Sequence, residues 1–170
     1  MAENKKTITV TEMVKELVFD IMNKSYLTGQ THEAAGLDYK AASYMQASED
    51  SDNIYQIKRS LTNYFSTLKS TLGEYLDEDN TTSDNTISQE IENDGELTLS
   101  FKLPSNYNNA SADALGNGIH SYLTDMALYD WFIITNKQDA QEYLTHADAC
   151  LNAVKRALYK RIRPNRPTYN

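Results

Sequence analysis

The segment YLTDMALYDWFIITNKQDA, residues 122–140, carries the end of one helix, a very short turn and the start of the next helix. Residues 126–134 are apolar almost all round, interrupted by Asp130 and partly by Tyr129. This is typical of a helix end that is central in a core or pressed against another subunit. Asn136, followed by Asp139, supplies the capping chemistry for a helix restart. The segment therefore predicts an antiparallel helical hairpin, with helices over about 112–135 and 137–162.

Two further amphipathic helices are predicted upstream of this hairpin. The first spans about 10–28, because Thr9 and Glu12 have the spacing of a capping box, apolar residues follow at helical spacing, and Gly29 is a typical stop. The second spans about 53–76 and follows capping residues at 50–52. Residues 30–52 are predicted as either a short helix or an ordered loop. The four helices predict a single, mainly α domain resembling a four-helix bundle.

Between the second and third helices we predict an acidic loop and an inserted β-hairpin arm, over 77–103. The expected strands, 86–92 and 96–103, flank Asn93-Asp94-Gly95, and an Asp-Gly pair supplies the positive φ angles of a hairpin turn. Apolar and polar residues alternate along the second strand, as in a half-buried strand. At the other end of the chain, the prolines after the last helix predict an extended basic tail over 163–170.

The composition excludes several classes of protein. With 40% hydrophobic residues and 12 tyrosines, the chain is not disordered. A single cysteine leaves no disulfide framework and no thiolate zinc site within one chain. No run of 18 apolar residues and no apolar leader segment occur. We therefore expect a soluble, acidic, intracellularly made protein without a membrane partner.

The charges are distributed unevenly along the chain, whose net charge is -8. Residues 77–96 include eight acids and no base, whereas the last 16 residues include six bases and no acid. One interpretation is that bases favour a helix C-terminus and acids keep a loop soluble. The other is head-to-tail assembly, in which the acidic arm of one subunit meets the basic tail of the next. Contact of the tail with nucleic acid phosphates is a further alternative.

A search for chemistry yields no catalytic or metal motif. The paired Glu-x-x-His motifs of a di-iron bundle are absent from the sequence. Glu142 and His146, one helical turn apart, are interpreted as a surface hydrogen bond, and Cys150 as a buried structural thiol. Gly116 and Gly118 are interpreted as permitting close packing or a late helix start. We predict no catalytic residue, no cofactor, no metal and no enzyme activity.

The C-terminal half resembles a known family. Its order is strand, loop, helix, very short turn, helix and Arg-rich end. The sequence words are Leu103-Pro104-Ser105-Asn106, the helix 122–134 with Trp131-Phe132, Asn136-Lys137-Gln138-Asp139-Ala140, and Leu158-Tyr159-Lys160-Arg161-Ile162-Arg163-Pro164. This layout is similar to the head–tail connector (adaptor) proteins of tailed bacteriophages, and the similarity covers about 95–164 best. The very acidic 77–94 stretch departs from the pattern.

The resemblance implies a structural virion protein at the phage neck, assembled in the host cytoplasm. Its expected partners are copies of itself in a ring, for example of twelve, the portal protein above it, neighbouring neck or tail proteins, and DNA in the channel. The subunit or portal interface is expected to use basic, acidic and apolar residues: Lys155, Arg156, Tyr159, Lys160, Arg161, Arg163, Arg166, Asp77, Glu78, Asp79, Glu90, Glu92, Leu128, Trp131 and Phe132.

A second hypothesis assigns the chain to a different class. A small acidic protein-interaction module, such as an inhibitor or a nucleic-acid-mimicking decoy, would use the acids of 77–96 to occupy a basic surface. It predicts a monomer or dimer that binds its partner in a salt-sensitive way. An enzyme with a site in the bundle core is the third alternative.

Overall fold

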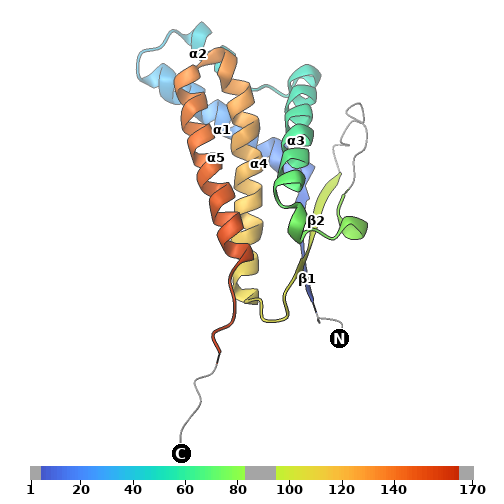
Figure 1. Cartoon of the computed structure of the whole chain (residues 1–170). Coiled ribbons are helices and arrows are strands. Elements are labelled where there is room, and N and C mark those ends of the chain that lie inside the picture. The colour runs from blue at the N-terminus through green and yellow to red at the C-terminus, as the bar shows by residue number, and fades with distance from the viewer. Residues whose placement is uncertain (1–4, 83–94, 165–170) are drawn as a thin grey trace, which may run out of the picture.

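The protein is a helical bundle that packs on one two-stranded sheet (Figure 1). This computed structural model describes residues 5–82 and 95–164. The elements in this part of the chain are β1 (Lys6–Met13), α1 (Val14–Ala34), α2 (Tyr39–Met45), α3 (Ser51–Thr71), β2 (Glu96–Leu103), α4 (Ala112–Thr135) and α5 (Lys137–Leu158), with short 3-10 turns η1 (Gly73–Tyr75), η2 (Glu78–Asn80) and η3 (Asn109–Ser111). The mainly α prediction is therefore confirmed.

The α4–α5 hairpin is confirmed as predicted. Asn136 separates the two helices, and its side chain accepts hydrogen bonds from the backbone N–H groups of Gln138 and Asp139. The α4 helix lies between α5 and α3 in Figure 1 and also packs on α1 and β1. This central position explains why residues 122–128 of α4 are buried all round. The last helix ends at Leu158, four residues before the predicted end.

The prediction that the first helix starts at about residue 10 is wrong. Residues 6–13 form strand β1, and α1 begins only at Val14. Thr9 and Glu12 therefore do not form a capping box, and the backbone N–H of Val14 donates to Gly95 O at 3.0 Å instead. Residues 7–11 are all β-branched, which favours a strand, and their partner strand provides the rest of the stabilisation.

The first helix also continues past Gly29 to Ala34. A Cβ at Gly29 would lie 2.7 Å from Gln46 Cγ and 2.9 Å from Ala42 O. This glycine is therefore required by the close approach of α2 and does not end the helix. The uncertain stretch 30–52 thus contains the last turn of α1 and the short helix α2.

The predicted hairpin arm is also corrected. Strand β2 pairs antiparallel with β1, in a register that runs from Lys6 opposite Leu103 to Met13 opposite Glu96. The other predicted strand, 86–92, and most of its turn lie outside the described residues. The opposite edge of β2 is bonded to the segment after α3: Asp77 N donates to Ser100 O at 2.7 Å, and Thr82 N donates to Thr98 O at 2.9 Å.

Polar residues join the helices around the core. The core itself is built from α1, α3, β2, α4 and α5 and includes fully buried Leu17, Leu61, Phe101 and Leu123. Asp130, which interrupts the apolar end of α4, accepts hydrogen bonds from Ser60 Oγ at 2.9 Å and Tyr64 Oη at 2.6 Å on α3. Among the described residues, no helix combines the length and apolar character needed to cross a bilayer.

Candidate functional site

The end of α5 presents a cluster of cations to solvent. Lys155 and Arg156 in its last turn are exposed, as are Lys160 and Arg163 beyond it. Arg161 is only half-buried, and its Nη1 donates to the carbonyl of Leu158 at 2.8 Å, where the negative end of the helix dipole lies. We call the exposed bases Lys155, Arg156, Lys160 and Arg163 the basic end, and Arg161 beside them caps the helix. Arg166 lies outside the described residues.

The chain that follows α5 is anchored to the body of the protein. Asn108 N donates to Lys160 O at 3.1 Å, and Ile162 N donates to Asn106 O at 2.8 Å. These bonds surround an isolated bridge between Arg161 and Tyr107, and the ring of Tyr107 is fully buried. The tail therefore leaves the bundle from a fixed point at the lower end of α5 (Figure 1).

The acidic segment is divided between an internal ion pair and an exposed turn. Asp77 is only 4% exposed, and its carboxylate lies 2.7 Å from Lys102 Nζ on β2 and accepts from Asn80 Nδ2 at 2.8 Å. These hydrogen bonds, with Lys102 first, lower the pKa of Asp77 below its usual value. Asp77 is therefore a correction to the predicted interface, because it is already paired inside this chain.

The remaining predicted acids differ in position. Glu78 and Asp79 are exposed on η2, and we call these two residues the acidic turn. Glu90 and Glu92 lie outside the described residues. Of these four acids, Glu78 and Asp79 lie on the surface in the described part of the chain.

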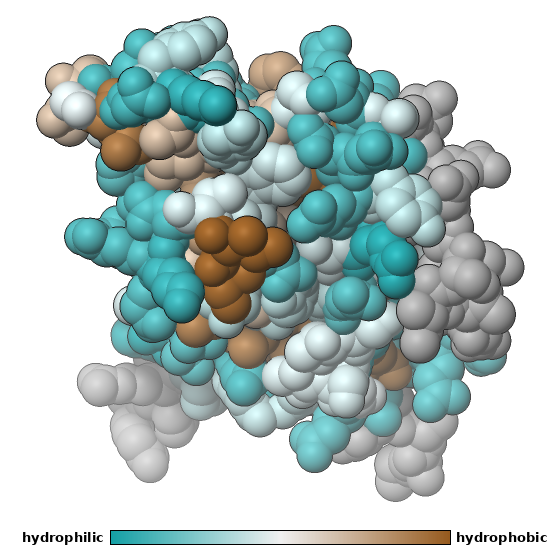
Figure 2. Space-filling view, turned by 90° about the horizontal axis from the view of Figure 1, so that it is seen from above, coloured by the Kyte–Doolittle hydropathy of each residue, from teal (hydrophilic) through white to brown (hydrophobic). Residues whose placement is uncertain are grey.

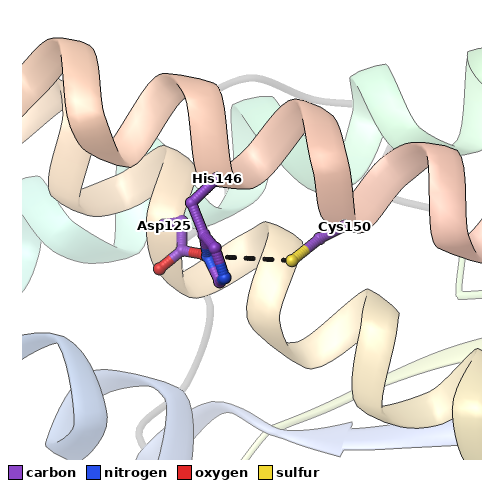
Figure 3. A group of neighbouring side chains, drawn as sticks. All are labelled: Asp125, His146 and Cys150. Atoms are coloured by element: carbon purple, nitrogen blue, oxygen red, sulfur yellow. Dashed lines mark hydrogen bonds and ion pairs between the residues drawn. The ribbon is translucent and has the colours of Figure 1, made fainter.

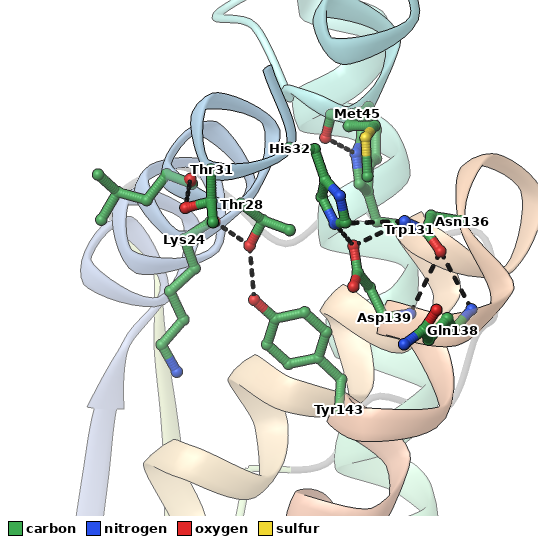
Figure 4. A network of polar contacts seen from close by, with 11 residues as sticks. Lys24, Thr28, Thr31, His32, Met45, Trp131, Asn136, Gln138, Asp139 and Tyr143 are labelled. Atoms are coloured by element: carbon green, nitrogen blue, oxygen red, sulfur yellow. Dashed lines mark hydrogen bonds and ion pairs between the residues drawn. The ribbon is translucent and has the colours of Figure 1, made fainter. Parts of the chain in front are cut away.

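The apolar end of α4 requires a further correction. Leu128 and Phe132 are fully buried, and the ring of Phe132 stacks on Tyr143 with centroids 5.5 Å apart. Trp131 is half-buried, and its Nε1–H donates to the carbonyl of Met45 on α2 at 2.8 Å (Figure 4). These side chains fill this chain's own core because α4 is its central helix, so Leu128 and Phe132 present no surface to a neighbour.

Other apolar residues are exposed at the same end of the molecule. Ile134, in the last turn of α4, is 81% exposed, and Ile133 beside it is also exposed. Figure 2 views the molecule from this end and shows hydrophobic residues standing among hydrophilic ones. Ile133 and Ile134 form what we call the apolar end.

A polar network holds the apolar end in place. His32 Nε2 lies 2.7 Å from Asp139 Oδ2, and Thr28 Oγ1 lies 3.0 Å from Tyr143 Oη (Figure 4). Both contacts join the last turns of α1 to the first turns of α5. Together with the bond from Trp131, they fix α1 and α2 against the α4–α5 turn.

A separate cluster of donor atoms lies between α4 and α5 (Figure 3). Asp125 is almost fully buried on α4, with Oδ1 3.2 Å from Lys24 Nζ and Oδ2 2.5 Å from His146 Nδ1. Cys150, one turn after His146, has its Sγ 3.8 Å from the same Nδ1. His146 therefore pairs across to Asp125 and not, as predicted, along α5 with Glu142.

This arrangement is not a nucleophilic relay. A relay histidine contacts its carboxylate with one ring nitrogen and its nucleophile with the other. Here both Asp125 and Cys150 face Nδ1. Burial, followed by the nearby charge of Asp125, also raises the pKa of the Cys150 thiol, which disfavours the thiolate. Cys150 itself is half-buried, so it is less enclosed than predicted.

Another histidine joins three elements through two ion pairs. His120 on α4 has Nδ1 2.7 Å from Glu12 Oε2 and Nε2 2.8 Å from Asp20 Oδ2. The hydrogen bond with Glu12, reinforced by that with Asp20, raises the pKa of His120 to about 9. His120 is therefore a cation at neutral pH. Sequence reasoning missed this site because its members are about 100 residues apart.

Comparison with known proteins assigns no family to this chain. No family model matches it, and neither a curated protein nor a solved structure is significantly similar to it.

Proposed function

We propose that this chain is a structural head–tail connector that assembles into a ring at the neck of a tailed bacteriophage, next to the portal, and performs no catalysis. The observation that carries the proposal is the placement of exposed charges of opposite sign on different flanks of a rigid bundle. In Figure 1, α5 with its basic end runs along one flank, whereas the acidic turn of η2 projects from the other.

Such a placement suits a ring. A ring needs two different, complementary patches on each subunit, so that one flank meets the opposite flank of the next copy. Electrostatic complementarity fixes the register of such a contact. The two flanks are linked through Tyr75 and Tyr159, whose hydroxyls are hydrogen-bonded and whose rings meet edge to face. This contact holds the basic end at a set distance from the segment that leads to η2.

The two ends of the bundle suit partners above and below a ring. At one end, Ile133 and Ile134 are exposed beside the α4–α5 turn. At the other end, the anchored tail leaves the body of the protein with Arg163 exposed. An apolar patch at one end and a basic extension at the other provide separate contacts for a portal protein and for a neighbouring neck protein or DNA.

The test is the native mass of the purified chain, measured by light scattering at low and high salt. We expect a ring at low salt that dissociates as salt rises, because screening weakens contacts between exposed charges. Reversing the basic end with Lys155→Glu and Arg156→Glu should abolish the ring, as should Glu78→Lys with Asp79→Lys. Each of these variants carries charges of one sign at residues 78–79 and 155–156, so in a mixture one variant should bind only the other. A chain with all four changes has these charges exchanged in sign between its two flanks and should assemble again.

The control is Lys137→Glu, a charge reversal at one exposed residue at the other end of α5, where the charged flanks do not meet. It should assemble as the unaltered chain does. A monomer at every salt concentration and protein concentration would contradict the ring. If that monomer bound a basic partner, and Glu78→Lys with Asp79→Lys weakened the binding, the acidic interaction module would be the better description.

A further inference from the structure

We propose that Asp125, His146 and Cys150 form a binding site for a divalent transition metal ion, and that Zn²⁺ is the ion that fits them best. The site is independent of the connector proposal, since it lies between α4 and α5 and uses none of the charged residues of the two flanks. It also departs from the sequence prediction of no metal, which rests on the single cysteine and on the absence of paired Glu-x-x-His motifs.

The first argument is the geometry of the donor atoms. One nitrogen, one carboxylate oxygen and one sulfur lie within 4.8 Å of one another. In a tetrahedral zinc site, bonds of about 2.0 to 2.3 Å place the ligand atoms about 3.4 to 3.6 Å apart. The Nδ1–Sγ distance of 3.8 Å is close to this value. The Nδ1–Oδ2 distance of 2.5 Å has to widen by about 1 Å on binding, and the exposed side chain of His146 has room to move.

The second argument is that the cluster combines a fixed part with an adjustable part. The Asp125 side chain on α4 is 2% exposed and contacts Lys24 on α1 and His146 on α5, whereas the His146 side chain is 64% exposed. His146 and Cys150 lie one turn apart on α5, so both project toward α4 from the same face. An ion can therefore enter from solvent, and three protein ligands leave one coordination position for water.

The third argument is the chemistry of the donors. Thiolate and imidazole together favour Zn²⁺ and its neighbours in the transition series over Mg²⁺ and Ca²⁺, which prefer oxygen ligands. Binding breaks the S–H bond of Cys150 and forms a sulfur–metal bond, and the thiol proton is released to solvent. The hydrogen that joins Nδ1 of His146 to Asp125 leaves that nitrogen as well, so that Nδ1 can bind the ion while Nε2 carries the ring proton. The thiolate and the Asp125 carboxylate then balance the charge of the ion. Lys24, whose side chain is 41% exposed, is free to turn from Asp125 into solvent.

The competing explanation is an ion-pair cluster in which Asp125 is neutralised by Lys24 and His146. In that explanation Cys150 only packs against the core, and its sulfur, 3.8 Å from Nδ1, adds nothing to the charge balance. The two explanations therefore differ in what a change of the sulfur does. They also differ in whether an added metal ion replaces Lys24.

The experiment is a titration of the full chain with Co²⁺ in the presence of a mild phosphine reductant. We expect a near-ultraviolet thiolate-to-cobalt charge-transfer band, the visible bands of tetrahedral Co²⁺, and displacement of both by Zn²⁺. Cys150→Ser should abolish the charge-transfer band, and His146→Gln should weaken binding by at least about tenfold. The matched control is His32→Gln, which removes another histidine–carboxylate contact, that with Asp139, and should leave the spectrum unchanged.

Thermal unfolding gives an independent readout. With Zn²⁺ well above its dissociation constant, the midpoint of the unaltered chain should rise by about 5 °C or more, and that of Cys150→Ser should not. Lys24→Met should unfold at a lower temperature without metal. Its midpoint should rise more than that of the unaltered chain when Zn²⁺ is added, because the ion replaces the lost cation. If Cys150→Ser does not fold, Cys150→Ala takes its place. Absence of the charge-transfer band, or a zinc effect that survives both cysteine variants, would overturn the site.

Discussion

At the scale of single residues, His120 illustrates how two carboxylates turn a histidine into a fixed cation. Its two ring nitrogens donate to Glu12 at the end of β1 and to Asp20 on α1. His120 on α4 thus binds both β1 and α1, which follows β1 directly in the chain. Because its ordinary pKa is 6.5 and its pKa in the folded protein is about 9, folding stabilises the protonated form.

The stability of the protein should therefore fall at mildly alkaline pH. The contribution of His120 to the free energy of unfolding is complete below pH 6.5 and is lost as the pH rises through about 9. We expect the loss to be about 2 kcal/mol, since part of the shift is screened by solvent. Urea unfolding at pH 6 and pH 9.5 measures it, with His120→Gln as the reference. Equal pH dependence in the two proteins would show that His120 does not stabilise the fold through its charge.

Two glycines in α4 should respond in opposite ways to the same substitution. A Cβ at Gly118 would lie 2.7 Å from Val154 Cγ2, whereas a Cβ at Gly116 would have its nearest contact at 3.9 Å, with Val10 Cγ1. We expect Gly118→Ala to destabilise the protein by about 1 to 3 kcal/mol through overpacking against α5. Gly116→Ala should stabilise it by about 0.5 to 1 kcal/mol through helix propensity. Chemical denaturation of both variants tests the pair, and a gain from Gly118→Ala would contradict this account of the α4–α5 contact.

At the scale of elements, β2 is hydrogen-bonded along both edges and its apolar side chains belong to the core. One edge pairs with β1, and the other is bonded to the 77–82 segment that follows α3. Leu97, Leu99 and Phe101 are buried against the helices. A strand that is paired on both edges offers no free edge to other chains, so β2 is a structural element and not an arm that reaches a neighbour.

The short segment after α5 should also contribute to stability. A chain that ends at Tyr159 loses the backbone bonds of Lys160 and Ile162 with residues 106–108, and the buried ring of Tyr107 becomes accessible. We expect it to unfold with a free energy about 1 to 3 kcal/mol lower than a chain that ends at Ile162. Urea unfolding of the two truncated chains makes the comparison. Equal stability would mean that this docking is incidental.

At the scale of the whole molecule, the acidic turn, the basic end and the apolar end are each bonded to the body of the described chain. The acidic turn is fixed to β2, the basic end to α5 and the 106–108 loop, and the apolar end to the α1–α5 network. Preorganised surfaces of this kind lower the entropic cost of association. An assembly component needs this property more than it needs a cavity for a substrate.

Truncation of the tail should separate folding from assembly. A chain that ends at Ile162 keeps its docking bonds but lacks Arg163 and Arg166. We expect its thermal midpoint to match that of the full chain, and we expect it to fail to join its assembly because the basic extension is lost. The full chain with Arg163→Ala and Arg166→Ala shows whether charge or length matters. Normal incorporation of the truncated chain into the assembly would contradict a docking role for the tail.

Local signals were enough to predict the α4–α5 hairpin and the existence of α3. The cap at Asn136, the apolar circumference of residues 126–134 and the helical spacing after residue 50 all act over one or two turns. The same kind of reasoning failed at Thr9 and Glu12, because a capping-box spacing also occurs by chance within a strand. It failed again at Gly29, where a glycine needed for helix packing has the same appearance as a helix stop.

The sequence did not predict which distant segments contact one another. The pairing of β1 with β2 joins residues about 90 apart, and the clusters of His120 and of Asp125, His146 and Cys150 each draw on more than one helix. Sequence patterns report the periodicity of one element and hence which face it buries. They do not report what that face is buried against, because this depends on the packing of the whole chain. The sequence alone therefore predicted the main helices and the uneven distribution of charge. The partner of strand β2, the buried position of Phe132 and the cluster of donor atoms are determined by the tertiary structure.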